Sequence, residues 1–148
     1  MKIKTAELIA EPLDWAVAKI VGKSYVHNGN DYAPDGKVYQ QGLSQPTGPH
    51  YSTDRSQAGP IMDREKINIQ YCRDLRDRNG LYIYADRFDN RSPAGYWRGD
   101  HKQPLVAAMR CFVASRLGEE VDVPDELVAS VDRTEDDTAP DDSPQMAP

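Results

Sequence analysis

The sequence is poor in cysteine, because Cys72 and Cys111 are the only two among its 148 residues. Neither has a second Cys or a His at the spacing of a zinc motif, and two cysteines do not make a disulfide framework. We therefore expect two reduced thiols and no metal site. Cys111 lies beside apolar residues, which is typical of a small buried side chain rather than a reactive one.

Long apolar runs are also missing from the sequence. No stretch approaches the roughly 20 apolar residues that a membrane-spanning helix needs. The first ten residues, MKIKTAELIA, lack the apolar run of a secretion signal. We expect a protein with no membrane segment that is located in the cytoplasm.

Clustered basic residues are absent as well. The densest basic stretch, Arg73 to Arg78, is interleaved with Asp74 and Asp77, which is typical of a mixed-charge hairpin loop. Proteins that bind duplex nucleic acid normally carry a clustered basic face that replaces phosphate counterions. Duplex nucleic acid is therefore not an expected partner.

The sequence shows no catalytic constellation. His27, His50 and His101 fall in separate predicted loops, and no local spacing links them or Asp54 to a nucleophile or a metal. No glycine-rich phosphate loop follows a predicted strand. We therefore expect no enzyme, no catalytic residues and no cofactor.

The C-terminal segment differs in composition from the rest of the chain. Residues 132–148 carry six acidic residues against Arg133 alone, a net charge of −5 out of −6 for the whole chain. Such a proline-containing acidic segment is expected to stay disordered. It could mimic nucleic acid toward a basic partner or simply increase solubility. We predict one domain at residues 1–131 and a disordered acidic tail at residues 132–148.

The stretch from Gln103 to Leu127 contains the strongest helix signal. Pro104 suits the first helical position, and Gly118 suits the residue just past the end. These residues bracket a helix with one apolar stripe, formed by Leu105, Ala108, Met109, Phe112 and Val113. We expect Arg110 and Arg116 to face water. The small residues Ala107, Ala108 and Ala114 would let a neighbouring element approach. An exposed side with Ala107 and Ala114 could form a homodimer, or these alanines could be ordinary helix formers on a solvated face.

A second helix is predicted near the N-terminus. Thr5 is a candidate cap for a short first turn, and Pro12 can restart the helix, which ends at Gly22. Trp15 lies off the centre of the apolar stripe of this helix. It therefore either packs sideways against the middle segment of the chain or lies partly exposed at a binding surface.

Two strands are predicted between these helices. Apolar residues alternate with polar ones in Ile67–Cys72 and in Leu81–Asp86, and Asn79–Gly80 between them favours a turn. We expect Ile67, Ile69 and Tyr71 to share the buried side. The predicted fold class is α+β, a small single domain in which an antiparallel β-hairpin or small sheet packs against two helices.

Long loops are predicted for the remaining segments. Residues 23–49 show little periodicity, and residues 89–102 read as a second loop in which Tyr96, Trp97 and Arg98 cover the edge of the core.

The hydrogen-bonding side chains that crowd residues 52–57, before Gly59-Pro60, indicate a turn. They could hold a ligand or satisfy their own backbone. The candidate ligand- or partner-binding residues are Trp15, Tyr51, Ser52, Thr53, Asp54, Ser56, Gln57 and Trp97.

Three blocks of the sequence resemble the phage NinX-like family. They are LDWAVAK at Leu13–Lys19, YSTDRSQAGPI at Tyr51–Ile61 and PLVAAMRCFVASRLGEEVDVPDEL at Pro104–Leu127. The middle block departs from the DWSQGGP-like pattern of the family, because Arg55 and Ala58 replace a tryptophan and a glycine. The family comprises phage and prophage proteins of unknown function, so the resemblance implies a phage accessory protein in the host cytoplasm and transfers no catalytic residue.

Two non-enzymatic functions are consistent with these features. The preferred hypothesis is a protein-interaction module that contacts a host or phage protein, on the grounds of small size, aromatic loops and the acidic tail. The alternative is a protein that binds a small molecule, such as a nucleotide, with its Tyr51–Ile61 loop. A homodimer is compatible with either hypothesis.

Overall fold

A computed structural model describes residues 1–40, 42, 46–73, 80–88 and 95–129 of the chain. The fold is α+β, as predicted. Its helices include the 3-10 helix η1 (Thr5–Glu7), α1 (Ala10–Val21), α2 (Arg55–Glu65) and α3 (Pro104–Leu117). The proposed tail at residues 132–148 lies outside the described residues. In the described part of the chain, no helix is long and apolar enough to span a membrane.

The strands form small antiparallel sheets. The largest has the order β5-β6-β7, made of β5 (Asn68–Arg73), β6 (Leu81–Phe88) and β7 (Tyr96–Asp100). A second sheet has the order β2-β3-β4, made of β2 (Tyr25–His27), β3 (Asn30–Tyr32) and β4 (Val38–Gln40). The ends of the described chain meet where β1 (Lys2–Lys4) pairs with β8 (Glu120–Asp122).

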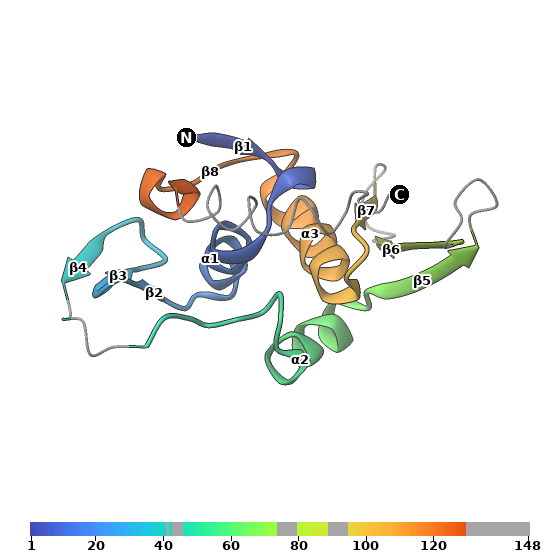
Figure 1. Ribbon diagram of the computed structural model, residues 1–148, viewed down its shortest axis with the longest axis horizontal. Helices are drawn as coiled ribbons and strands as arrows, with labels where there is room; N and C mark the ends of the chain where they lie inside the picture. Colours follow the sequence, from blue (N-terminus) through green and yellow to red (C-terminus); the bar gives the residue numbers. More distant parts are fainter. Residues whose placement is uncertain (41, 43–45, 74–79, 89–94, 130–148) are drawn as a thin grey trace, which may run out of the picture.

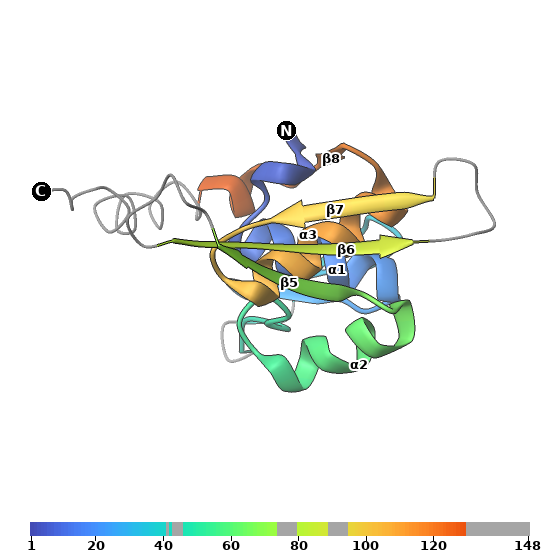
Figure 2. The same cartoon turned by 90° about the vertical axis from the view of Figure 1, so that its right-hand side faces the viewer.

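Helix α3 lies at the centre of the molecule. The β5-β6-β7 sheet packs on one side of it and α1 packs on the other, as Figures 1 and 2 show. The helix begins at Pro104 and ends at Leu117, with Gly118 just past its end, as the capping residues predicted. The buried surface of the helix is wider than the single predicted apolar stripe, because Val106, Ala107 and Cys111 are buried as well. A helix between two layers buries both of its sides.

Two residues of α3 are less exposed than a solvated helix face would make them. Arg110 does not simply face water, because its Nε donates to the carbonyl of Leu8 at 2.7 Å and its Nη1 donates to the carbonyl of Asp100 at 2.7 Å. Ala107 is fully buried within its own chain, so it cannot contribute to a homodimer surface.

Helix α1 ends at Gly22, which has the left-handed φ of 82°. Its buried side includes Leu13, Ala16 and Val17, and Trp15 is also buried. Sideways packing is therefore the correct interpretation of Trp15, over whose ring lies the ammonium of Lys19 at 5.3 Å. Thr5 does not cap the first turn, because its hydroxyl donates to the carbonyl of Gly118 at 2.6 Å.

The predicted hairpin is confirmed, with Ile69 opposite Ala85 and Tyr71 opposite Ile83. Ile67, Ile83 and Ala85 are buried, but Tyr71 is exposed, contrary to expectation. The two predicted long loops were wrong in their described parts. Residues 23–49 contain β2, β3 and β4, and residues 89–102 contain β7, so Trp97 lies in a strand.

The segment before Ile67 is a helix rather than a turn. Asp54 caps it, and Ala58, Ile61, Met62 and Glu65 form its buried stripe at helical spacing. Pro60 lies inside α2, where its missing N–H removes one helical hydrogen bond. The Asp54 cap and the burial of the apolar stripe outweigh that cost. The Gly59-Pro60 pair by itself indicated a turn and gave no sign of this helix.

Candidate functional site

The polar segment at Tyr51–Gln57 connects the loop after β4 to α2, and most of its polar groups bond within the chain. Asp54 Oδ1 accepts from the backbone N–H of Ser56 at 2.9 Å and from the Ser56 hydroxyl at 2.6 Å, and Asp54 Oδ2 accepts from Gln57 Nε2 at 2.9 Å. These hydrogen bonds lower the pKa of Asp54. Gln57 Oε1 in turn accepts from the backbone N–H of His50 at 2.7 Å.

The first residues of this segment are tied to α1. Tyr51 and Ser52 are buried, whereas Thr53 is exposed. The N–H of Ser52 donates to Oδ1 of the buried Asp14 at 2.8 Å. Burial raises the pKa of Asp14 to about 6, although hydrogen bonds from Ser52 oppose that shift. Asp14 was not predicted as part of this cluster. The one signal in the sequence is that this carboxylate lies among the apolar residues of α1.

The two candidate tryptophans are not part of the Tyr51–Gln57 segment. Trp15 lies on α1 and Trp97 on β7, and these elements flank α3 on opposite sides (Figure 1). Trp97 packs partly against the core, with the guanidinium of Arg87 over its ring at 5.4 Å. The structure therefore does not assemble the predicted site residues into one site.

Uncovered aromatic side chains gather instead on the side of the β5-β6-β7 sheet that faces away from α3. Phe88, Tyr96 and Tyr82 are 64%, 45% and 38% exposed. They alternate along β6 and β7 with the residues that pack on α3, as the strand register requires. We call Tyr82, Tyr84, Phe88, Tyr96 and Arg98 the aromatic face. Figure 2 shows this side of the sheet toward the viewer, with α1 and α3 behind it.

Contacts within the aromatic face hold its side chains in place. The guanidinium of Arg98 lies 3.8 Å from the centre of the Tyr84 ring, and Phe88 and Tyr96 lie 4.8 Å apart between ring centres. Arg98 also pairs with Asp100, through Nε to Oδ1 at 3.0 Å and Nη2 to Oδ2 at 3.0 Å. The Tyr82 hydroxyl donates to Asp100 and accepts from Arg98.

Sequence reasoning missed the aromatic face as a site. The alternation of Tyr82 and Tyr84 with Ile83 and Ala85 already placed these tyrosines on the outer side of a strand. The other half of the face was hidden because the segment of Tyr96 and Arg98 read as a loop. Only the pairing of β7 with β6 brings the two halves together.

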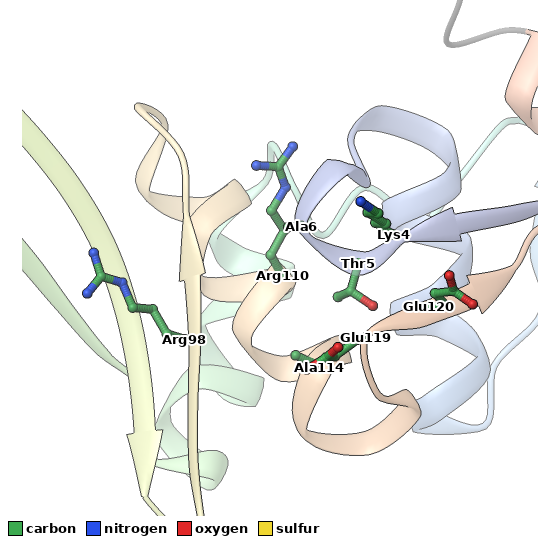
Figure 3. Close-up of a pocket in the computed structure, with 8 residues that line it drawn as sticks. All are labelled: Lys4, Thr5, Ala6, Arg98, Arg110, Ala114, Glu119 and Glu120. Atoms are coloured by element: carbon green, nitrogen blue, oxygen red, sulfur yellow. The ribbon is translucent and has the colours of Figure 1, made fainter.

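A pocket of about 620 Å³ lies beside β7, between that strand and the segment of β1 and η1. We call it the β7 pocket. Figure 3 shows Arg98 directed away from Thr5 and Glu119, toward β6, and Arg110 rising from α3 beside Ala6. Burial lowers the pKa of Arg110, and the nearby Asp100 opposes that shift. The lining residues are Lys4, Thr5, Ala6, Arg98, Arg110, Ala114, Glu119 and Glu120.

The side chains best suited to acid–base, metal or thiol chemistry are His27 with Glu11, and Cys111. His27 Nδ1 lies 2.7 Å from Glu11 Oε1, which also accepts from the Tyr25 hydroxyl at 2.9 Å. Among the residues that the structure describes, no three His, Cys, Asp or Glu side chains are grouped so that they could hold a metal ion. Burial raises the pKa of the Cys111 thiol to about 12, so this thiol stays protonated at neutral pH.

Comparison with known proteins identifies the family. A family model described as Bacteriophage P22, NinX matches residues 4–116, which include η1, α1, α2, the β5-β6-β7 sheet and most of α3. No curated protein matches the chain. Among solved structures, the chain is similar to a phage protein from Bacillus cereus ATCC 14579, with 14% identity, a TM-score of 0.40 and coverage of 74% of this chain and 90% of that one. Likeness at that level supports no inference about function. The match of the family model over most of the chain shows that this protein belongs to the bacteriophage P22 NinX family.

Proposed function

We propose that this NinX-family protein is a non-enzymatic protein-interaction module, which acts in the host cytoplasm and binds a phage or host protein through the aromatic face. One observation carries the proposal. Three large aromatic side chains, Tyr82, Phe88 and Tyr96, are exposed together on one side of a sheet whose other side is buried against α3.

The chemistry of the aromatic face supports a protein partner. Tyrosine, phenylalanine and arginine are enriched at the centres of protein interfaces, where they contribute much of the binding energy. Arg98 is already held by Asp100 and stacked on Tyr84. Binding would therefore immobilise fewer free side chains, which reduces its entropic cost.

A small-molecule site at Tyr51–Ile61 is the alternative, and it has less support. Both carboxylate oxygens of Asp54 accept hydrogen bonds from the chain, and the N–H of Ser52 is bonded to Asp14. A ligand there would have to replace these bonds. Duplex nucleic acid has little support as well, because residues 1–131 carry a net charge of only about −1 without the acidic tail.

Affinity capture with matched surface variants tests the proposal. The triple variant Tyr82→Ala, Phe88→Ala, Tyr96→Ala removes the aromatic side chains of the face. The control variant Val38→Ala, Tyr39→Ala removes two exposed apolar side chains from β4. Tagged proteins are incubated with lysate of infected host cells, and captured proteins are quantified by mass spectrometry.

The proposal expects a partner in near-stoichiometric amount with the wild type and the β4 variant, and at least tenfold less with the aromatic variant. Thermal melting checks that both variants fold. A partner captured equally by all three proteins would contradict the proposed surface. A small molecule released on denaturation, with no protein partner, would favour the alternative at Tyr51–Ile61.

A further inference from the structure

The β5-β6-β7 sheet has an open edge at β7. Within the described chain, β7 pairs with β6 and has no strand on its other side. An open edge presents unpaired backbone N–H and C=O groups, which proteins normally cover or protect. The edge of β7 faces the β7 pocket, which makes it accessible but recessed.

The register determines which backbone groups point into the pocket. The N–H of His101 donates to the carbonyl of Ile83, which continues the β6-β7 ladder by one step. Hydrogen-bonded and non-hydrogen-bonded pairs alternate in an antiparallel ladder. Gly99 and Trp97 therefore bond to β6, whereas Tyr96, Arg98 and Asp100 direct their N–H and C=O groups away from it.

Contacts at the far end of the edge agree with this assignment. The carbonyl of Asp100 accepts from Nη1 of Arg110 at 2.7 Å, so it points toward α3 and η1 rather than toward β6. Arg110 also donates to the carbonyl of Leu8 and so closes one end of the open edge. Within the described residues, the N–H and C=O of Arg98 have no hydrogen-bond partner in the chain.

We propose that an extended segment of the protein partner enters the β7 pocket and adds to β7 as a fourth strand. One residue of that segment exchanges two backbone hydrogen bonds with Arg98. This inference rests on the proposed function and deepens it, because the side chain of Arg98 belongs to the aromatic face while its backbone lines the pocket. A bound segment would thus run along the border of that face.

The shape of the β7 pocket admits a separate extended segment but not the β7 strand of a second copy. The edge lies between β7 and the segment of β1 and η1 (Figure 3), so a second copy could not present its own equally recessed β7 to it. A separate extended segment can enter. Its recognition depends on the main chain, because the lining combines the side chains of Lys4 and Arg110 with those of Glu119 and Glu120 and favours neither sign of charge.

A proline substitution on the open edge tests the backbone contact. Arg98→Pro removes an N–H that points away from β6, and edge strands tolerate proline at such positions. Arg98→Ala is the matched control, because it removes the same side chain and keeps the N–H. The probes are peptides selected from a displayed random 12-residue library against the wild-type chain, and their dissociation constants are measured by fluorescence anisotropy.

The proposal expects the selected peptides to bind Arg98→Pro at least tenfold more weakly than Arg98→Ala. Equal binding by the two variants would overturn it, as would a library that yields no binder. Peptides that bind both Arg98 variants equally but lose binding to the aromatic triple variant would overturn strand addition and leave the proposed function standing.

A second measurement does not depend on the fold of the proline variant. Amide hydrogen exchange of the wild-type chain is followed by NMR with and without the selected peptide. Strand addition expects the amides of Arg98 and Tyr96 to exchange at least tenfold more slowly in the complex, since both lie on the open edge and point away from β6. Unchanged exchange at both amides in a saturated complex would overturn the proposal even if Arg98→Pro failed to fold.

Discussion

Gly99 of β7 lies so close to Ala107 of α3 that a Cβ atom on Gly99 would fall 2.3 Å from the carbonyl oxygen of Ala107. The same atom would lie 2.6 Å from the backbone nitrogen of Cys111. Sheet and helix therefore approach backbone to backbone at this point. The small side chain of Ala107 permits this approach, as its position in the sequence indicated.

Gly99→Ala is expected to destabilise the protein, because the clashing atoms are backbone and cannot move independently of α3. Overpacking of this kind costs about 3 kcal/mol, which corresponds to a melting temperature lower by very roughly 10 °C in a domain of this size. Thermal melting followed by circular dichroism measures the change.

Gly59→Ala is the matched control. Gly59 lies in α2, and apart from its chain neighbours and the backbone of its own helix no atom lies within 4 Å of its added Cβ. Alanine there should change the free energy of unfolding by less than about 1 kcal/mol, because its better helix propensity is opposed by the ring of the following Pro60. A Gly99→Ala variant as stable as the wild type would show that β7 does not pack on α3 as described.

Asp14 should make the stability of the protein depend on pH. Burial raises its pKa from 3.8 to about 6 in the folded protein, so the folded state binds a proton that the unfolded state releases between these values. The contribution of Asp14 to the free energy of unfolding therefore falls as pH rises from about 4 to 6, by on the order of 3 kcal/mol. Chemical denaturation across this range measures the effect.

Asp14→Asn isolates this contribution from those of other carboxylates. Asparagine can still accept from the N–H of Ser52 but does not ionise. Relative to the wild type, the variant should gain stability between pH 4 and pH 7. A constant difference between the two proteins over that range would mean that Asp14 does not carry a raised pKa.

Glu65 should have the opposite pH dependence. It is buried and pairs with Arg116 at 2.6 Å and with Arg87 at 3.0 Å. Burial acts to raise its pKa, but the hydrogen bonds of Arg116 and Arg64 and the charge of Arg87 outweigh that effect and lower it. Its stabilising contribution is therefore present at neutral pH and lost as pH falls through the lowered pKa.

Glu65→Gln should lower the free energy of unfolding at pH 7 by about 2 kcal/mol, because it leaves the partly buried Arg87 without its carboxylate. The loss should shrink in acid. Asp125→Asn serves as the control, since Asp125 pairs with the N-terminus at an exposed site, where such pairs contribute little. Equal losses for both variants in urea denaturation would contradict the structural role of Glu65.

Removal of residues 132–148 should leave the melting temperature unchanged within about 2 °C. The reason is compositional, because a segment with six acidic residues and little apolar surface cannot contribute to a core. A large drop in differential scanning calorimetry would show that the domain boundary at residue 131 is misplaced. The truncation also removes five units of negative charge, so the comparison is made at high salt.

Local signals in the sequence predicted the main helices well. Gly22 and Gly118 mark the ends of α1 and α3, and Pro104 marks the start of α3, because caps act within one helical turn. The β5-β6 hairpin was predictable for a similar reason, since alternation over six residues defines a strand. The resemblance of three blocks to NinX-like proteins was confirmed by the family match.

The three-residue strands and helix α2, which contains Pro60, were not predictable from the sequence. β2, β3 and β4 have three residues each, which is too short for a period to show. Helix α2 was hidden by Gly59-Pro60, which locally favours a turn, whereas the burial of Ile61, Met62 and Glu65 favours the helix. The polar residues of Tyr51–Gln57 were recognised as a group, but their bonding partners were not.

The sequence by itself determined the α+β class, the C-terminal ends of α1 and α3, the start of α3, the hairpin and the family, because each depends on neighbouring residues or on the order of short blocks. Tertiary structure alone decided that β1 pairs with β8 across the chain, that Tyr82 and Tyr96 share one open face, and that β7 is an edge. Whether a strand has a neighbour depends on where distant segments pack, and side-chain order along a single strand does not encode that.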